Sequence, residues 1–166
     1  MDQDVRIRPI SDSDWRGIVA LEARTYTEFA LSEEQSALES RARASPATCF
    51  VLDLQRQVVG YVLALPYPMF QYPDLTRTEE SVFPSRNLHL HDLVIAEGFR
   101  RRGLAKHLLH HLTATAGSRM YERISLVAVA GSETFWSGCG YRAHHEVAVP
   151  RSYGANAVYM SRTVQG

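Results

Sequence analysis

The sequence predicts a single α+β domain with a mixed, mostly antiparallel sheet of about seven strands, flanked by about four helices. Short runs rich in valine, leucine and tyrosine alternate with stretches at helical spacing along the 166 residues. One strand–helix–strand succession over residues 87–130 implies a right-handed crossover and a central pair of parallel strands. No repeat, low-complexity tract or linker divides the chain, so residues 1–166 are expected to form one domain.

Composition and charge limit the classes of protein to which this chain can belong. The hydrophobic share of 45% and the charged share of 22% are ordinary for a globular protein. Lys+Arg and Asp+Glu balance at 18 each, so no overall field favours nucleic acid or an anionic membrane as a partner. No apolar run approaches the roughly 20 residues that span a bilayer, and the first ten residues lack a signal peptide's apolar core. Two cysteines, Cys49 and Cys139, are too few for a disulfide framework, which favours a reducing cytoplasm.

The N-terminal part is expected to contain one strand and two helices. Alternation of apolar residues with arginine predicts a half-buried strand over residues 5–9. Apolar residues at helical spacing predict a helix from Trp15 to about Thr25, after several N-cap candidates. Ser32–Gln35 matches a capping box and should open a second helix, which runs to about Ala42 before Pro46.

A hairpin and a long irregular segment follow. Cys49–Leu54 and Val58–Leu65 are rich in strand-forming residues and flank a short polar turn, which predicts an antiparallel pair. Residues 66–86 interleave prolines with aromatic residues, and irregular segments of this length in compact domains are often functional. We expect this segment to cover the core or to form a wall for an apolar substrate, and one role does not exclude the other.

The central strand is expected at Asn87–Ile95 and the central helix from Arg101 to about Ala116. Arg123–Ala130 is a nearly continuous apolar run, as expected of a strand that is buried on both faces. A short helix is expected at Glu133–Ser137, where glycines follow. Two closing strands are expected at about residues 141–149 and 157–164.

A basic turn that contains glycine, Arg100–Ala105, lies between the central strand and the central helix. Backbone N–H groups at a helix start are unpaired and carry the positive end of the helix dipole, which suits a pyrophosphate. Gly103 lets the backbone approach a ligand closely, and arginines add charge-assisted hydrogen bonds to phosphate oxygens. A solvated basic helix start is the alternative interpretation.

Here the sequence resembles a known family. Arg100, Gly103 and Ala105 match the R/Q-x-x-G-x-G/A signature of the GNAT acyltransferase superfamily, and Glu133–Tyr141 resembles its second acetyl-CoA motif. The motif-level match covers roughly residues 87–142, and the order of elements agrees over nearly the whole chain. The resemblance implies that acetyl-CoA is the co-substrate. The residues expected to bind it are Leu93, Val94, Ile95, Arg100, Arg101, Arg102, Gly103, Leu104, Ala105, Lys106, Ser132 and Trp136.

Two histidines, His89 and His91, stand two residues apart on the predicted central strand, so their side chains should leave the same face. An amine that attacks a thioester must first lose its proton, and imidazole accepts a proton near neutral pH. We therefore interpret the pair as the general base, acting directly or through water. Two hydrogen-bonded structural histidines are the alternative. A metal site is not expected, because no third ligand follows at a diagnostic spacing. Asp92 is expected on the opposite face, as a reserve base.

The paired histidines followed by Phe99 and the basic turn resemble the arylalkylamine N-acetyltransferases, in which such histidines carry the proton from the amine. Leu21–Tyr26 resembles the first helix that borders the amine pocket there. The resemblance implies direct transfer, in a ternary complex, of an acetyl group from acetyl-CoA to a small aromatic or apolar primary amine. The residues expected to bind this amine are Tyr26, Phe29, Tyr67, Phe70 and Tyr153.

The general acid stays unassigned. The family often has a tyrosine before the glycines of its second motif, whereas this chain has Trp136, whose indole cannot donate a useful proton. Tyr141 and Tyr153 are candidates, and a thiolate can also leave unaided. Two other functions stay open, a protein or peptide N-acetyltransferase and a non-catalytic module that binds acyl-CoA. The sequence does not distinguish a monomer from a homodimer.

Overall fold

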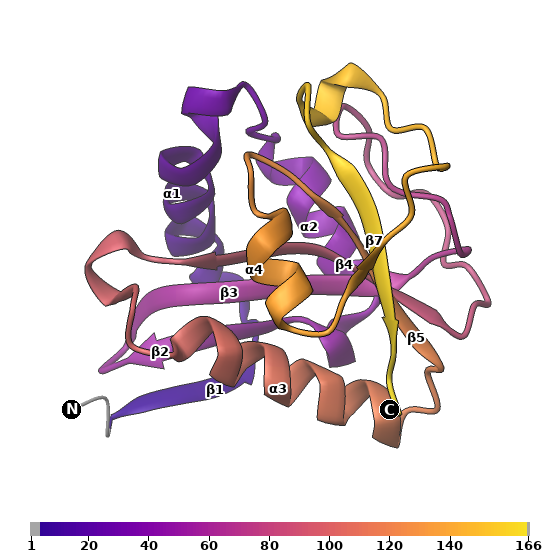
Figure 1. Cartoon of the computed structure of the whole chain (residues 1–166). Coiled ribbons are helices and arrows are strands. Elements are labelled where there is room, and N and C mark those ends of the chain that lie inside the picture. The colour runs from indigo at the N-terminus through magenta and orange to yellow at the C-terminus, as the bar shows by residue number, and fades with distance from the viewer. Residues whose placement is uncertain (1–3, 166) are drawn as a thin grey trace.

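The computed structural model describes residues 4–165, whose strands form one seven-stranded mixed sheet in the order β1-β2-β3-β4-β5-β7-β6 (Figure 1). Only β4 and β5 pair in parallel, and the other neighbours are antiparallel. The predicted α+β class, with a central parallel pair in a mostly antiparallel sheet, is therefore confirmed. The strands are β1 (Val5–Pro9), β2 (Phe50–Leu54), β3 (Gln57–Pro66), β4 (Asn87–Ile95), β5 (Arg123–Ala128), β6 (Arg142–Ala143) and β7 (Val158–Thr163).

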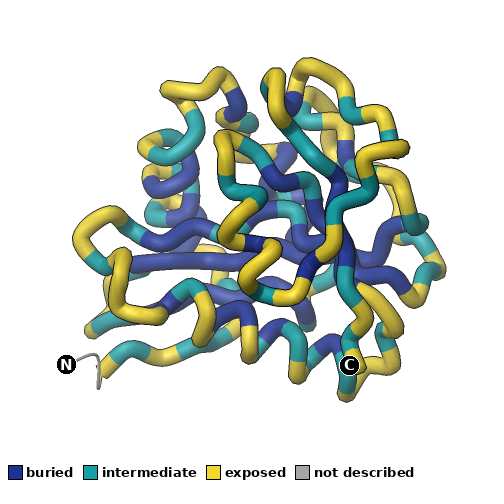
Figure 2. Tube along the Cα trace, viewed as in Figure 1, coloured by how far each residue is buried: buried dark blue, intermediate teal, exposed yellow. Residues whose placement is uncertain are grey.

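Two helical layers cover the sheet. The helices are α1 (Trp15–Tyr26), α2 (Gln35–Ala44), α3 (Leu104–Ser118) and α4 (Glu133–Gly138). Leu108 and Leu112 of α3 pack with Trp136 of α4 in one core cluster, and Ile18 of α1 packs with Leu38 of α2 in the other. Burial of each such side chain contributes roughly 1.5–3 kcal/mol. The central strands are accordingly buried while the connecting loops are exposed (Figure 2). No helix within residues 4–165 is both long and apolar enough to cross a lipid bilayer.

Two helix starts differ from the sequence prediction. The central helix begins at Leu104 rather than Arg101, because Arg101 and Gly103 have φ values of 66° and 76°, which a right-handed helix cannot include. Helix α2 begins at Gln35, and Ser32 does not cap it. The Ser32 hydroxyl instead donates a 2.6 Å hydrogen bond to Glu22. The predicted capping box is therefore wrong, because a tertiary partner takes the serine.

The last two predicted strands are shorter than expected. Strand β6 covers only Arg142–Ala143 of the predicted 141–149, and β7 covers Val158–Thr163. The long segment between β3 and β4 contains no helix or strand, as predicted.

Strands β4 and β5 separate toward their carboxyl ends. They pair only from Asn87 to His89, opposite residues 123–125. Beyond that point β5 continues along β7, and β4 continues along β3 as far as Ile95. One backbone edge of β4 between Leu90 and Ile95 therefore lacks a partner in β5, and a wedge opens between the two strands.

A β-bulge lies at His91 in the middle of this wedge. In the register with β3, Asp92 pairs with Leu63 and Leu90 pairs with Ala64, so His91 is an extra residue. The bulge interrupts strand alternation, and Asp92 contacts Tyr61 on the side of α1 and α2, where His91 also lies. The prediction that Asp92 faces away from His91 is therefore wrong.

Candidate active site

A cavity of about 330 Å³ occupies the wedge between β4 and β5. Its walls come from β4, the end of β5, α4, the α1–α2 connection and residue Leu75 of the long loop. Most of the lining is apolar, including Leu31, Leu90, Leu93 and Leu126. Two carboxylic acids and one imidazole also lie on this otherwise apolar lining, namely Glu33, Asp92 and His91. Apolar walls with a few convergent polar groups are typical of a ligand site.

The imidazole of His91 is held by Glu33. Its Nε2 lies 2.6 Å from Oε2 of Glu33, and the histidine side chain is 2% exposed. An ionised carboxylate can only accept, so Nε2 carries the hydrogen and Nδ1 of the neutral ring keeps its lone pair. Nδ1 is buried and has no hydrogen-bond partner within residues 4–165. His91 therefore lines the cavity and, among residues 4–165, keeps one buried nitrogen without a hydrogen-bond partner.

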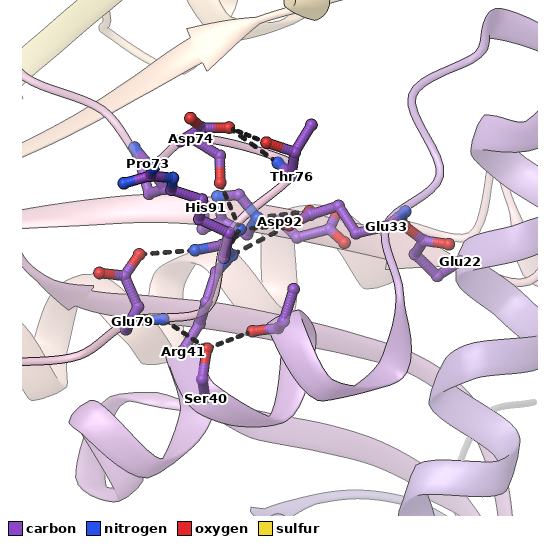
Figure 3. A network of polar contacts seen from close by, with 12 residues as sticks. Glu22, Glu33, Ser40, Arg41, Pro73, Asp74, Thr76, Glu79, His91 and Asp92 are labelled. Atoms are coloured by element: carbon purple, nitrogen blue, oxygen red, sulfur yellow. Dashed lines mark hydrogen bonds and ion pairs between the residues drawn. The ribbon is translucent and has the colours of Figure 1, made fainter.

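Glu33 is ionised because the His91 ring and the Arg41 guanidinium both donate hydrogen bonds to it. Burial alone would raise its pKa, but the charges and hydrogen bonds of His91 and Arg41 lower it instead. Its backbone N–H also donates to Glu22, at 2.7 Å. Figure 3 shows His91, Glu33 and Arg41 in one buried network with Glu79 and the turn that contains Asp74.

Asp92 is a second proton-binding group beside His91. Burial raises its pKa to about 7, although His91 and a 2.6 Å hydrogen bond from Tyr61 oppose the shift. Tyr26 also lines the cavity, and burial raises the pKa of its phenol. Asp92 therefore changes charge near neutral pH, which the sequence alone did not indicate.

His89 has a different environment from His91. It is 1% exposed, and its Nδ1 lies 2.9 Å from the hydroxyl of Ser125, which also accepts a 2.8 Å hydrogen bond from Asn87. Burial lowers its pKa well below the ordinary value, so it stays neutral. Its ring lies near those of Tyr67 and Tyr159, and the lining of the cavity does not include it.

A second cavity, of about 320 Å³, lies at the start of α3. Arg100, Arg101 and Lys106 line it together with Gly103 and Ala105. The first intrahelical bond runs from His107 N–H to Gly103, so the three preceding amides have no acceptor in the helix. Apart from the adjoining backbone, no atom of residues 4–165 lies within 4 Å of the position that a Cβ on Gly103 would occupy. The predicted phosphate turn is thus an open, cationic hollow.

Three residues show how the basic turn is placed relative to β4, Phe99 and the wedge cavity. Arg100 donates from Nε to the carbonyl of Ile95, at 3.0 Å, which joins the turn to the end of β4. Arg102 does not line the hollow, and its guanidinium lies 5.1 Å from the ring centre of Phe99. Phe135 lines both cavities, so the cationic hollow and the wedge cavity adjoin.

The predicted acceptor residues are only partly brought together. Tyr26, Phe29 and Tyr153 line the wedge cavity, but Tyr67 and Phe70 do not. Tyr67 packs on Phe83 and His89. The backbone N–H of Phe70 donates to Tyr159, and its ring packs on His144. Leu75 supplies the only lining from residues 66–86.

The two tyrosines considered as general acids have other surroundings. Tyr141 lies behind Trp136, with ring centres 5.4 Å apart, outside the cavity lining. Its hydroxyl is buried and, within residues 4–165, has no partner, and burial raises its pKa. Tyr153 lines the cavity, but its hydroxyl donates to the carbonyl of Pro73. Ser132 and Trp136, expected to contact the cofactor, both line the wedge cavity.

Sequence reasoning missed Glu33, Arg41, Leu75 and Phe135. Glu33 belongs to the four residues interpreted as a capping box, and Arg41 lies on an ordinary helical repeat. No spacing in the sequence connects either of them to His91. Among residues 4–165, no group of three or more His, Cys, Asp or Glu side chains is arranged to hold a metal ion.

The sheet splays around a cavity, and a basic glycine turn begins the helix that follows the splayed strand. The model of the Acetyltransferase (GNAT) family matches residues 15–141, and the chain therefore belongs to this family. A search of curated protein sequences finds no significant match.

Solved structures share the fold at low sequence identity. Ard1 from Thermoplasma volcanium is 18% identical with a TM-score of 0.76, and the match covers 98% of this chain and 99% of that chain. The loading GNATL domain of CurA from Lyngbya majuscula is 16% identical with a TM-score of 0.78, over 97% and 98%. N-acetylglutamate synthase from Neisseria gonorrhoeae, complexed with coenzyme A and N-acetyl-glutamate, is 17% identical with a TM-score of 0.74, over 98% of this chain and 35% of that chain.

Proposed function

We propose that the protein transfers an acetyl group from acetyl-CoA to a small primary amine with an aromatic or apolar body, directly within a ternary complex. His91 carries this proposal, because it lines an apolar cavity and its buried Nδ1 has no hydrogen-bond partner among residues 4–165. The cavity adjoins a cationic hollow at a helix start, as a site for two substrates requires. Membership of the GNAT family supports acyl-CoA as one of them.

The residues of the turn fit the phosphates of a coenzyme A ester. Arg101 and Lys106 supply charge, the first amides of α3 supply donors, and Gly103 leaves space for close approach. The unpaired edge of β4 at Leu93–Ile95 is available to hydrogen-bond the extended arm that carries the acyl group. Acetyl-CoA supplies the activated acyl group, while the chain positions it and removes a proton from the amine.

His91 acts as the general base in this proposal. Its Nδ1 accepts the proton of the incoming ammonium, and Glu33 stabilises the imidazolium that forms. Asp92 lies on the same side of the strand and remains the reserve base. A thiol with an ordinary pKa of about 8.5 is an adequate leaving group near neutral pH, so the proposal requires no tyrosine as general acid.

The cavity favours an uncharged body on the amine. Within residues 4–165, no lysine or arginine lines it, so it offers no charged partner for a substrate carboxylate. The aromatic rings of Phe29 and Phe135 are 50% and 38% exposed and line the same cavity. These two rings present apolar surface to the part of the amine that extends toward the solvent-exposed side of the cavity.

A thiol-release assay with acetyl-CoA tests the proposed function. The amine panel contains arylalkylamines, polyamines, amino acids and short peptides. We expect the highest kcat/KM with arylalkylamines and much lower values with the matching amino acids, whose carboxylates lack a cationic partner. Preference for peptides would show a protein N-acetyltransferase instead. Coenzyme A binding by calorimetry without thiol release from any amine would show a non-catalytic module.

Reversal of one charge in the turn should weaken acetyl-CoA binding. We expect Arg101→Glu to raise the KM for acetyl-CoA by about tenfold or more with little change in kcat, because it places a carboxylate beside the phosphates. Arg119→Glu is the matched control, since it reverses an exposed charge just past the other end of α3. Equal KM values for the two variants would contradict the assignment of the cationic hollow.

A further inference from the structure

Arg41 is a completely buried arginine that contacts both the partner of His91 and the loop that walls the cavity. Its side chain is 0% exposed, and its guanidinium bonds Glu33 on one side and Glu79 on the other. We propose that Arg41 is a positioning residue that fixes the orientation of His91 through Glu33 and the acceptor wall at Leu75 through residues 74–79. This inference rests on the proposed function, in which His91 is the general base.

The first arm runs from Arg41 through Glu33 to His91. Arg41 donates from Nε and Nη2 to Oε1 of Glu33, at 3.0 and 2.5 Å. The other oxygen of the same carboxylate, Oε2, lies 2.6 Å from Nε2 of His91. The carboxylate is thus held at both oxygens and cannot rotate without breaking a bond to Arg41 or to His91. Arg41 thereby keeps the hydrogen of His91 on Nε2, which leaves the lone pair on Nδ1.

The second arm runs from Arg41 to the loop. Nη1 donates to Oε1 of Glu79 at 2.5 Å, and Nη2 donates to the carbonyls of Asp74 at 3.0 Å and Arg77 at 3.2 Å. Leu75, which lines the cavity, lies between these two carbonyls in the chain. Figure 3 shows the turn at Asp74 and Glu79 gathered around the same guanidinium. The position of the apolar wall therefore depends on Arg41.

The burial of Arg41 makes this arrangement rigid. A buried guanidinium must keep its donors satisfied, and two carboxylates and two carbonyls do so here. Its planar fork can reach all of these acceptors at once, whereas a lysine ammonium is a compact group with three donors. One side chain therefore couples the site that removes the proton to the site that holds the body of the amine.

The two arms can be cut separately. Glu33→Gln removes the charge next to His91, and Glu79→Gln removes the charge that anchors the loop. We expect Glu33→Gln to lower kcat about 100-fold with a KM for the amine within about twofold, because a neutral amide no longer fixes the tautomer. We expect Glu79→Gln to raise the KM for the amine about fivefold or more and to change kcat little, because only uniform binding is lost. Arg41→Lys should change both constants.

The matched control is Arg43→Met, which removes an exposed arginine from the same helix, where it pairs only weakly with Glu39. It should leave kcat and KM unchanged. If Arg41→Lys does not fold, the two glutamine variants decide the proposal. If Glu33→Gln and Glu79→Gln lowered kcat by the same factor and raised the KM for the amine by the same factor, the proposal would be overturned, because two separate arms would then not exist.

The nitrogen chemical shifts of His91 give a readout that needs no substrate. In the wild type we expect the hydrogen on Nε2, and in Glu33→Gln and Arg41→Lys a mixture of tautomers. Glu79→Gln and Arg43→Met should retain the wild-type pattern. An unchanged tautomer in Glu33→Gln and Arg41→Lys would overturn the positioning role even if acetyl transfer occurs. Failure of every amine in the thiol-release assay would refute the proposed function instead, while this spectrum would still show whether Arg41 orients His91.

Discussion

His91→Gln should lower kcat for acetyl transfer by about 100-fold or more, because glutamine cannot accept the proton that the ammonium must lose. The amide of the new glutamine can still donate a hydrogen bond to Glu33, the carboxylate that His91 contacts in the wild type. The loss should therefore fall on proton transfer more than on folding. The KM for acetyl-CoA should change little, because the cationic hollow is built from other residues.

His89→Gln is the control for this experiment, since it alters the neighbouring histidine without touching the cavity lining. We expect its kcat to stay within about tenfold of the wild type, with a lower melting temperature because buried bonds around Ser125 are disturbed. Initial rates across neutral pH and thermal unfolding of both variants provide the comparison. Full turnover in His91→Gln would show that another group, with Asp92 the first candidate, removes the proton.

Asp92→Asn should remove a pH dependence of stability that the wild type shows between about pH 4 and 7. The pKa of Asp92 is raised from 3.8 to about 7, so in this range the folded protein binds a proton that the unfolded chain has lost. Stability from this group is therefore full below pH 4 and is lost as pH rises to 7. The shift corresponds to at most about 4 kcal/mol of unfolding free energy.

Urea unfolding at pH 4.5 and pH 8 measures this effect. The advantage of Asp92→Asn over the wild type should grow by a few kcal/mol at the higher pH, because asparagine cannot ionise. Asp12→Asn, which changes an exposed carboxyl, should follow the wild type at both pH values. Parallel curves for Asp92→Asn and the wild type would show that Asp92 is not held protonated by burial.

The strands and helices were largely predictable because their signals are local. Each signal is contained within a few consecutive residues, as in the alternation of β1, the two runs of the β2–β3 hairpin and the apolar run of β5. The two wrong helix starts have different causes. Ser32 bonds a tertiary partner, Glu22, instead of capping α2. At the basic turn, the positive φ values of Arg101 and Gly103 delay the start of α3.

The residues that line the two cavities were predictable to different degrees. Arg101, Gly103 and Lys106 lie within one short motif, and the structure gathers them around one hollow. The aromatic residues of the long loop carried no such signal, because irregular backbone has no fixed period. The sequence therefore did not indicate that Tyr67 and Phe70 lie away from the cavity and that Leu75 lines it.

The sequence by itself determined the order of elements and the cationic turn at the head of α3, since both follow from the chemistry of neighbouring residues. Only the tertiary structure decided the state of the histidines. The bulge at His91 turns Asp92 to the same side, and buried Glu33, held by Arg41, binds one nitrogen of His91 while the other has no partner among residues 4–165. Strand alternation predicts a face, but it cannot predict which distant charge will meet a side chain there.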